Sequence, residues 1–270
     1  MPGILNEKAD VICYACGRGE APENTLEAIA HCQKVNPDWR IEMDLQLTQD
    51  GEVVLFHDAD LKRIANLSRS IAELTYDELC GVIAGRFFSV KNGLQLDGRE
   101  FKVPLLCDVF GSFPKAKFLL DIHSTNLAFV DKVIRLVERF YMEEQIVIVS
   151  KHHHILTLFR KKRPGWKYGA SAREVKLILI AHFLGLTRLI KPRAEVIMMP
   201  VIYKNRKVVG IRLMNLFKRQ SVKTWLWLHE GNQVVTVDSR DQFERVKEYG
   251  ADAFFTSCPE RVYQELYSIK

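Results

Sequence analysis

Short apolar runs alternate with longer amphipathic stretches along almost the whole chain, and this alternation constrains the fold most strongly. An apolar run of roughly four to eight residues suits a strand buried on both faces, whereas a helix repeats its apolar residues every three or four positions. The stretch 127–141 shows the helical pattern, with apolar residues at 129, 130, 133, 134, 137 and 140. Strands that alternate with such helices indicate an α/β protein with a parallel sheet.

The number of expected strands favours a (β/α)8 TIM barrel over an open sheet. The expected strands are residues 11–16, 39–47, 117–123, 145–150, 167–171, 195–200, 233–238 and 253–256. Helices are expected at 23–35, 127–141, 175–190 and 240–249, and Gly250 is placed to end the last of them. We find no linker, internal repeat or low-complexity segment, so residues 1–270 are expected to form a single domain.

Residues 59–114 do not follow the alternation. They contain loops rich in Gly, Asn and Asp, and one short helix expected at about 75–84. The segment stands where a simple helix should connect the second and third strands of a barrel. We therefore expect it to be an inserted excursion over the top of the barrel.

Composition narrows the partners and the compartment. The net charge is +6 with mixed signs and no polybasic arm, which does not point to nucleic acid but fits an anionic substrate or membrane surface. Cys13 and Cys16 lie in an apolar run and are expected to be buried hydrophobes rather than a redox or metal pair. The N-terminus shows no apolar signal core, so the reducing cytoplasm is the expected location.

The most apolar stretch, 175–190, contains Lys176, His182 and Arg188 and is too polar for a membrane span. It is either a barrel helix packed on its neighbours or an interfacial helix that gives peripheral membrane contact through 175–219. The second interpretation depends on the basic residues that follow it: Lys191, Arg193, Lys204, Arg206, Lys207, Lys218 and Arg219.

The segment 40–58 carries the strongest chemical signal. Glu42 and Asp44 are two positions apart on an expected strand, so their side chains share one face. Asp50-Gly51 predicts a two-residue hairpin turn after it. That turn would place His57 directly opposite Asp44, so two carboxylates and an imidazole would converge.

Other expected strands also end in polar residues, and barrel active sites form at these ends. Asp121 and His123 share one face of the third strand, and Ser150 and His152 follow the fourth. Carboxylates from adjacent strand ends suit Mg²⁺ or Ca²⁺, and a neighbouring imidazole can act as a general acid or base. The alternative is a buried ion-paired cluster that only fixes the barrel mouth.

Several motifs together resemble the glycerophosphodiester phosphodiesterase family. They are Pro22-Glu23-Asn24-Thr25, Glu42-x-Asp44, Thr48-Gln49-Asp50-Gly51, His57-Asp58, Val103-Pro104 and the tail from Gly250 to Pro259. The resemblance is dense over 11–124 and thinner to the end. It implies a barrel in which a two-carboxylate strand and a later acidic residue hold a divalent metal. It also implies hydrolysis of a glycerol- or lysolipid-type phosphodiester.

The chain departs from the family pattern at its proton-transfer residues. The family's first strand ends in His-Arg-Gly, and the places counted back from Pro22 hold Tyr14, Ala15 and Cys16. A shift to Gly17-Arg18-Gly19 restores the arginine and the glycine but not the histidine, and it requires a shorter loop. The family's later Glu-x-Lys is Asp121-x-His123. The tryptophan of the family's penultimate strand is missing from the run 234–238, and Trp225 and Trp227 lie in what we interpret as a helix.

Three hypotheses follow from this resemblance. The first is a metal-dependent phosphodiesterase in which Glu42, Asp44 and Asp121 hold the cation. The second is a binding or regulatory protein on a catalytically dead scaffold, and the third is a transferase that forms a phosphodiester. In the first, His57, His123 and Tyr14 are the expected catalytic residues, and Arg18, Ser150 and His152 the expected substrate contacts.

Overall fold

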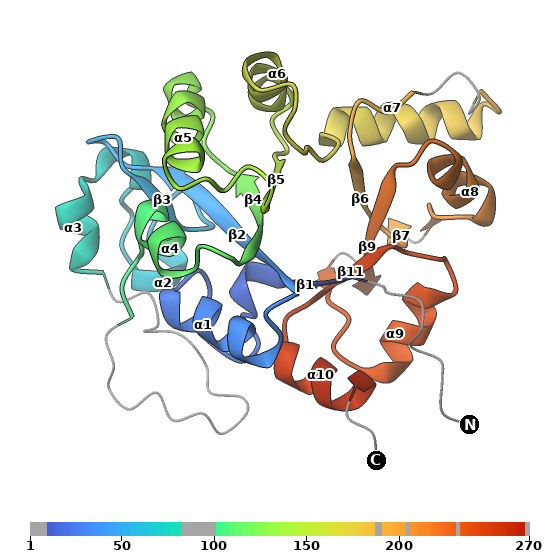
Figure 1. Ribbon diagram of the computed structural model, residues 1–270, viewed down its shortest axis with the longest axis horizontal. Helices are drawn as coiled ribbons and strands as arrows, with labels where there is room; N and C mark the ends of the chain where they lie inside the picture. The colour runs from blue at the N-terminus through green and yellow to red at the C-terminus, as the bar shows by residue number, and fades with distance from the viewer. Residues whose placement is uncertain (1–9, 83–100, 187–190, 204–205, 231–232, 268–270) are drawn as a thin grey trace.

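A curved sheet of parallel strands forms the centre of the molecule (Figure 1), and two isolated bridges link its two ends into a circuit. The computed structural model describes residues 10–82, 101–186, 191–203, 206–230 and 233–267. In order round the circuit, the strands are β1 (Asp10–Cys13), β2 (Arg40–Leu47), β4 (Lys117–Ile122), β5 (Ile146–Val149), β6 (Val196–Pro200), β9 (Lys223–Glu230) and β11 (Ala253–Thr256). Strand β11 pairs with β1 in parallel and so completes the circuit on that side.

The fifth strand of the barrel is reduced to two residues. Tyr168 forms a parallel bridge to Ile148 of β5, and Gly169 forms one to Val196 of β6. A Cβ atom on Gly169 would lie 2.5 Å from Cγ1 of Val149, so only glycine allows the chain to approach β5 this closely. The predicted (β/α)8 barrel is confirmed, although 167–171 forms only these bridges.

The sequence interpretation was wrong about the penultimate barrel strand. Trp225 and Trp227 belong to β9, not to a helix, and β9 pairs in parallel with both β6 and β11. The expected barrel strand 233–238 is instead a short return arm, β10 (Gln233–Val235), which pairs antiparallel with β9. Trp225, Leu226, Trp227 and Leu228 form an unbroken apolar run, which periodicity alone cannot assign to a strand or a helix.

The hairpin after β2 also differs from its expected register. Strand β3 (Val53–Leu55) pairs with β2 so that Leu47 faces Val53 and Leu45 faces Leu55. The N–H of Phe56, not of His57, donates to the Asp44 carbonyl over 2.9 Å. Three residues form the loop instead of two, and Gly51 has the left-handed φ of 82° that such a loop requires at its last position.

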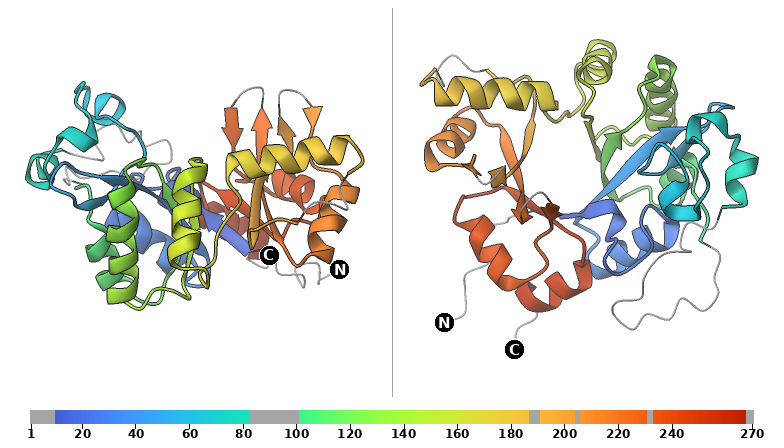
Figure 2. Two further views of the ribbon diagram at one scale, coloured as in Figure 1. Left: turned by 90° about the horizontal axis from the view of Figure 1, so that it is seen from above. Right: turned by 180° about the vertical axis from the view of Figure 1, so that it is seen from behind.

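Helices surround the barrel and connect its strands. They are α1 (Leu26–Val35), α4 (Leu106–Ser112), α5 (Leu127–Arg139), α6 (His153–Lys162), α7 (Ala172–Phe183), α8 (Ile211–Arg219), α9 (Arg240–Lys247) and α10 (Pro259–Tyr267). Thr25 caps α1, and Ser171 with Glu174 forms a capping box on α7. Gly250 follows α9 at φ 68°, as predicted. Figure 2 shows that α7 lies across the barrel, whereas α5 and α6 run alongside their strands.

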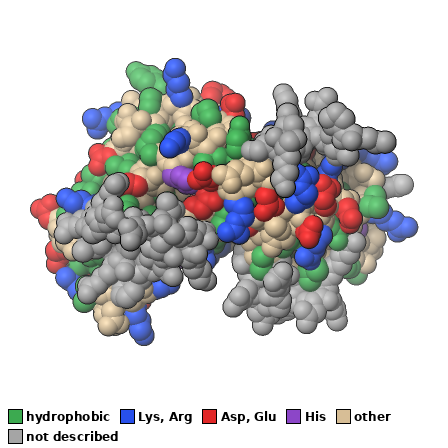
Figure 3. All heavy atoms as spheres, turned by 90° about the horizontal axis from the view of Figure 1, so that it is seen from below, with side chains coloured by type: hydrophobic (Ala, Val, Ile, Leu, Met, Phe, Trp, Pro, Cys, Tyr) green, Lys and Arg blue, Asp and Glu red, His purple; other side chains and the backbone are tan. Residues whose placement is uncertain are grey.

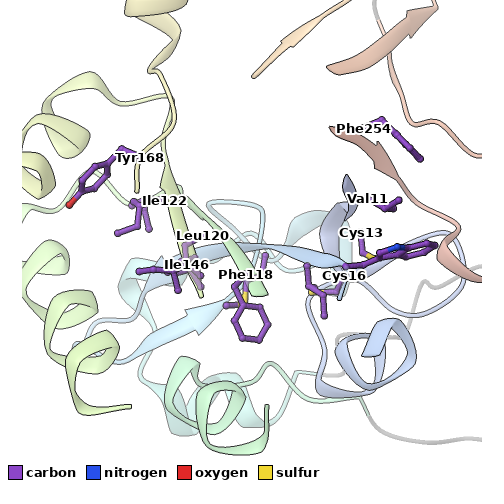
Figure 4. Packing of buried hydrophobic residues seen from close by; sticks show 14 of the residues in the cluster. Val11, Cys13, Cys16, Phe118, Leu120, Ile122, Ile146, Tyr168 and Phe254 are labelled. Atoms are coloured by element: carbon purple, nitrogen blue, oxygen red, sulfur yellow. The ribbon is translucent and has the colours of Figure 1, made fainter. Parts of the chain in front are cut away.

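Two layers of side chains pack on the barrel strands. Figure 4 shows Val11 and Cys13 of β1 and Phe118 of β4 on the side that faces the helices. The alternate residues Ile12 and Leu119 belong to a second cluster with Trp225, in the barrel interior. Cys13 and Cys16 are fully buried, as expected of small hydrophobes.

The excursion between β3 and β4 has a small core of its own. Short helices α2 (Lys62–Ala65), η2 (Ile71–Glu73) and α3 (Tyr76–Cys80) pack Leu61, Ile71 and Leu79 against Val54 of β3. Helix α3 is therefore the helix that was expected at 75–84, and it ends at Cys80. Residues 83 and 84 of the expected range lie outside the described part of the chain.

The described residues include no helix of the length and apolarity that a membrane crossing requires. On the face shown in Figure 3, the coloured basic and acidic side chains are interspersed, as the mixed charges of the sequence predicted.

The short 3-10 helix η1 (Tyr14–Cys16) follows β1, where the sequence suggested that the strand continues.

Candidate active site

Three carboxylates meet at the carboxyl ends of β2 and β4. Glu42 and Asp44 share one face of β2, as predicted, and Asp44 is the direct parallel neighbour of Asp121 on β4. One oxygen from each residue lies within 4.8 Å of the other two. Glu42 and Asp44 are 4% and 2% exposed, whereas the Asp121 side chain is 31% exposed and opens the cluster to solvent.

Neighbouring residues hold these carboxylates in place. Asn24 donates from Nδ2 to Oδ2 of Asp44 over 2.8 Å and accepts from the Asp44 N–H over 3.0 Å. The backbone N–H of Ala15 donates to Oε2 of Glu42. Because Asn24 adopts a left-handed φ of 55°, it faces back to β2 before α1 begins.

The cluster carries more negative charge than its surroundings balance. Burial raises the pKa of Glu42 well above its usual range, and the charges of Asp44 and Asp121 raise it further. A divalent cation among these oxygens would relieve that repulsion, and all-oxygen donors suit Mg²⁺ or Ca²⁺. The residues present therefore fit the metal site that the sequence predicted.

His123 lies beside the carboxylates, directly after β4. Its Nε2 is 2.9 Å from Oδ1 of Asp44 and 3.6 Å from Oδ2 of Asp121. Burial disfavours the charged imidazole, but the hydrogen bonds and charges of Asp121 and Asp44 outweigh burial and raise its pKa to about 10. In the absence of a cation, the His123 imidazole is therefore protonated and positively charged at neutral pH.

His57 approaches the cluster from the other side. Its Nδ1 is 2.7 Å from Oδ1 of Asp58, and Arg63 donates to Oδ2 of Asp58 over 2.6 Å. This pairing orients the ring and leaves Nε2 available. The rings of His57 and His123 are 4.9 Å apart between centroids, so both imidazoles adjoin Asp44 even though His57 is not its hairpin partner.

Tyr14 follows β1 directly and lies beside Glu42. Burial and the negative charge of Glu42 raise the pKa of its phenol, so Tyr14 stays protonated near neutral pH and can donate but not accept a proton. The exposed guanidinium of Arg18 lies 5.2 Å from the centre of the Tyr14 ring. Ala15, Cys16 and Gly17 then follow with left-handed φ values of 44°, 59° and 78°.

Ser150 and His152 lie in the turn directly after β5 and are joined by a hydrogen bond. The buried Ser150 hydroxyl donates to the Ile122 carbonyl over 2.7 Å and accepts from the His152 N–H over 3.1 Å. Burial lowers the pKa of His152, and the charge of Lys151 lowers it further. These contacts fix the turn after β5, and the roles of both residues in substrate binding stay predictions.

Two cavities border the cluster, and Lys151 lines both. The larger one measures about 660 Å³ and contains Asp121, Ser150 and Trp227. The smaller one measures about 570 Å³ and contains His57 and His123. Among the described residues Lys151 forms no ion pair, so its ammonium is available to an anion between the two cavities.

Sequence reasoning missed three of these residues. The motif that contains Asn24 does not indicate a role for this residue. Lys151 stands beside three consecutive histidines and has no sequence signal of its own. Trp227 was assigned to a helix, although it lines the larger cavity, where the indole N–H has no hydrogen-bond partner among the described residues. A signal for Asn24 was available, because asparagine is one of the few residues that readily adopts a left-handed φ.

The fold and the cluster together define a (β/α)8-barrel enzyme whose site lies at the carboxyl ends of the strands. The sequence model of the glycerophosphoryl diester phosphodiesterase family matches residues 17–261. The chain belongs to this family, which is a family of phosphoric diester hydrolases. The match begins directly after the altered residues Tyr14, Ala15 and Cys16.

Relatives and solved structures agree with this placement. A human lysophospholipase D, GDPD1, is 27% identical over 95% of this chain and 86% of its own length. A glycerophosphodiester phosphodiesterase from Bacillus altitudinis is 28% identical over 90% of this chain and 92% of its own. The glycerophosphoryl diester phosphodiesterase domain of a Mycobacterium tuberculosis protein superposes with a TM-score of 0.80 at 17% identity, over 95% of this chain and 98% of that one.

A further solved structure is a phosphodiesterase from Oleispira antarctica in complex with the product sn-glycerol-3-phosphate. It superposes with a TM-score of 0.72 at 16% identity, over 96% of this chain and 97% of that one. At this identity the likeness concerns the fold.

Proposed function

We propose that this protein hydrolyses a glycerophosphodiester or a lysophospholipid-type phosphodiester with the help of a divalent cation and altered acid/base residues. The observation that carries the proposal is the convergence of Glu42, Asp44 and Asp121 with two imidazoles at one strand edge. In the cation-free protein, burial and the charges of Asp44 and Asp121 raise the pKa of Glu42, and a cation among the three carboxylates would favour its charged form.

Each side chain has a separate task in the proposed reaction. Glu42, Asp44 and Asp121 would hold the cation, which supplies charge neutralisation at the phosphate when bound. His57, oriented by Asp58, would accept or donate a proton through Nε2. His123, charged in the free protein, would act as the partner acid and protonate the departing alcohol.

Cations of the chain itself would hold the phosphate. The family's arginine is replaced by Ala15, whose side chain is 1% exposed and buried against the barrel. Lys151 is placed to supply the missing charge, because it borders the cavity of Asp121 as well as that of the two histidines. Arg18 and the Tyr14 hydroxyl would contact the phosphate on the side opposite Lys151. Ser150 and His152 would contact it from the turn after β5.

A hydrolysis assay tests the proposal directly. The purified protein would be given a panel of glycerophosphodiesters and lysophospholipids with Mg²⁺, Ca²⁺ or EDTA, and the released alcohol and phosphomonoester would be measured. We expect turnover with a cation and none with EDTA. Cation-independent turnover, or the same turnover in Glu42→Gln, would exclude the assigned role of the carboxylates.

A second candidate is a phosphodiester-binding protein without turnover. The loss of the histidine at position 14 favours it, because loss of a general acid or base costs about 10²–10⁴-fold in rate. The double variant Tyr14→His/Ala15→Arg separates the two candidates. If the wild type binds a phosphodiester without turnover and the double variant hydrolyses it, the protein is a binding protein on this scaffold.

The surroundings of the reaction are also part of the proposal. We infer contact with a membrane through part of 175–219, and a reducing cytoplasmic location. All six cysteines are free, which agrees with a reducing compartment. Lys204 lies outside the described residues. Helix α8 directs Leu213, Met214 and Phe217 into the core, whereas α7 exposes Leu177, Ile180 and Phe183, so the proposed contact uses α7.

A further inference from the structure

Helix α7 exposes more apolar surface than a barrel helix should. Of its apolar residues only Ile178 is buried, while Leu177 and Phe183 are 56% and 68% exposed. Leu184, directly after the helix, is 67% exposed. Since α7 lies across the barrel (Figure 2), it presents one flank to the strand ends and another outward. A contiguous apolar patch of this kind is typical of a binding surface.

The inner flank of α7 forms one wall of the larger cavity. Val175, Leu179 and Phe183 line it, each one helical turn after the last, and face Met198 and Trp227 on the strands. The polar end of this cavity is formed by Asp121, Ser150 and Lys151, and the apolar part runs below α7. A polar end at the carboxylates with a long apolar body matches a phosphate that carries one acyl chain.

Basic side chains border the outer flank. Arg173 is exposed on α7, Lys176 is exposed at the border of the larger cavity, and Lys191 and Arg193 line a second hollow with Leu177 and Leu184. None of the four forms an ion pair among the described residues. Exposed apolar residues flanked by free cations are the pattern of a helix that lies in the interface of an anionic membrane.

We propose that α7 docks this protein on the surface of an anionic bilayer, and that a single-chain lipid passes from there into the cavity below α7. The proposal rests on the proposed function for the chemistry at Asp121, but the docking does not depend on turnover. Leu177, Leu184 and the four cations would contact the bilayer. Val175, Leu179 and Phe183 would contact the acyl chain on its way to the carboxylates.

Vesicle sedimentation tests the docking without any assay of activity. Wild-type protein would be mixed with vesicles of phosphatidylcholine alone or with added phosphatidylglycerol, and the pelleted fraction would be measured. We expect binding to the anionic vesicles only, and Leu177→Glu should weaken it by at least about tenfold. Leu127→Glu is the matched control, because Leu127 on α5 has the same 56% exposure and should bind like the wild type.

A second variant tests whether the cavity below α7 holds the acyl chain. Ala172→Trp places a large ring in the wall of the cavity below α7. We expect it to raise KM for a lysophospholipid severalfold and to leave KM for a short glycerophosphodiester unchanged. Leu177→Glu should leave turnover of the short substrate unchanged, because it lies outside this cavity.

Three results would overturn the proposal. The first is equal sedimentation of wild type, Leu177→Glu and Leu127→Glu. The second is a stable dimer in gel filtration that Leu177→Glu dissociates, which would assign the patch to a second copy of the chain. The third is an equal KM change for both substrates in Ala172→Trp. A wild type that binds vesicles but hydrolyses nothing would refute the proposed function and leave the docking intact.

Discussion

Asp44 and Asp121 are direct neighbours in the parallel pairing of β2 with β4, at the point where both strands reach the barrel mouth. Neither strand could shift by one residue without moving its carboxylate to the opposite face of the sheet. The pairing that builds the barrel wall is therefore the same pairing that builds the cation site.

The cation should stabilise the fold through Glu42. Saturating Mg²⁺ or Ca²⁺ is expected to raise Tm, since a ligand at about 100 times its Kd adds ~2.7 kcal/mol to the free energy of unfolding. Glu42→Gln should abolish this increase while leaving the cation-free protein at least as stable, because burial and the charges of Asp44 and Asp121 already disfavour the charged form of Glu42. Differential scanning calorimetry with Glu52→Gln, an exposed carboxylate, as control would decide it.

Both imidazoles should be needed for turnover. His57→Ala and His123→Ala are each expected to lower kcat by about 10²–10⁴-fold. His154→Ala, which removes an exposed histidine beyond β5, should cost little. Full activity in His123→Ala would show that His123 is only a polar remnant of the family's lysine.

Stability should depend on pH through His123 when no cation is bound. Its pKa rises from 6.5 in the unfolded chain to about 10 in the folded protein, so its ion pair contributes fully below pH 6.5 and is lost as pH rises to 10. In EDTA, the Tm difference between wild type and His123→Gln should therefore be largest near pH 6 and shrink towards pH 10. A difference that stays constant or grows over that range would contradict the assignment.

Lys151 should matter for phosphate binding. Lys151→Met is expected to weaken binding of sn-glycerol-3-phosphate by about tenfold, the equivalent of ~1.4 kcal/mol for a charge-assisted hydrogen bond at an open site. Isothermal titration calorimetry would measure this, with Lys151→Arg expected to retain most of the affinity. Lys62→Met, a cation at the far side of the smaller cavity, is the matched control.

Gly169 should be sensitive to a single methyl group. In Gly169→Ala the new Cβ would lie 2.5 Å from Cγ1 of Val149, a stiff and buried side chain, which should lower the free energy of unfolding by about 1–3 kcal/mol. The double variant Gly169→Ala/Val149→Ala should recover part of that loss. Denaturant unfolding of the three variants would measure both effects, and additive losses in the double variant would refute the contact.

Local sequence patterns accounted for most of the fold because they act over short distances. The apolar runs that became β2, β4 and β11 and the helical period of α5 needed no tertiary information. The run at Trp225–Leu228 did need it, since its residues are apolar on every face and only pairing with β6 and β11 makes it a strand. The hairpin register failed for a related reason, because Asp50-Gly51 fits loops of two or three residues.

The candidate site could be predicted wherever residues share a strand. Glu42 with Asp44, and Asp121 with His123, followed from a period of two. Contacts between separate loops could not be found in this way. The pairing of Asn24 with Asp44 and the position of Lys151 between two cavities depend on how the turns after β1 and β5 approach β2 and β4.

The three consecutive left-handed residues at 15–17 form a turn directly beside Glu42. A left-handed conformation costs an ordinary residue about 1–2 kcal/mol relative to glycine, and both Ala15 and Cys16 adopt it. Cys16 keeps the conformation, with its Sγ donating to the Glu42 carbonyl over 3.5 Å and its own carbonyl accepting from Cys32 Sγ over 3.3 Å. These two contacts hold the turn between β2 and α1, directly beside the Glu42 carboxylate that accepts from the Ala15 N–H.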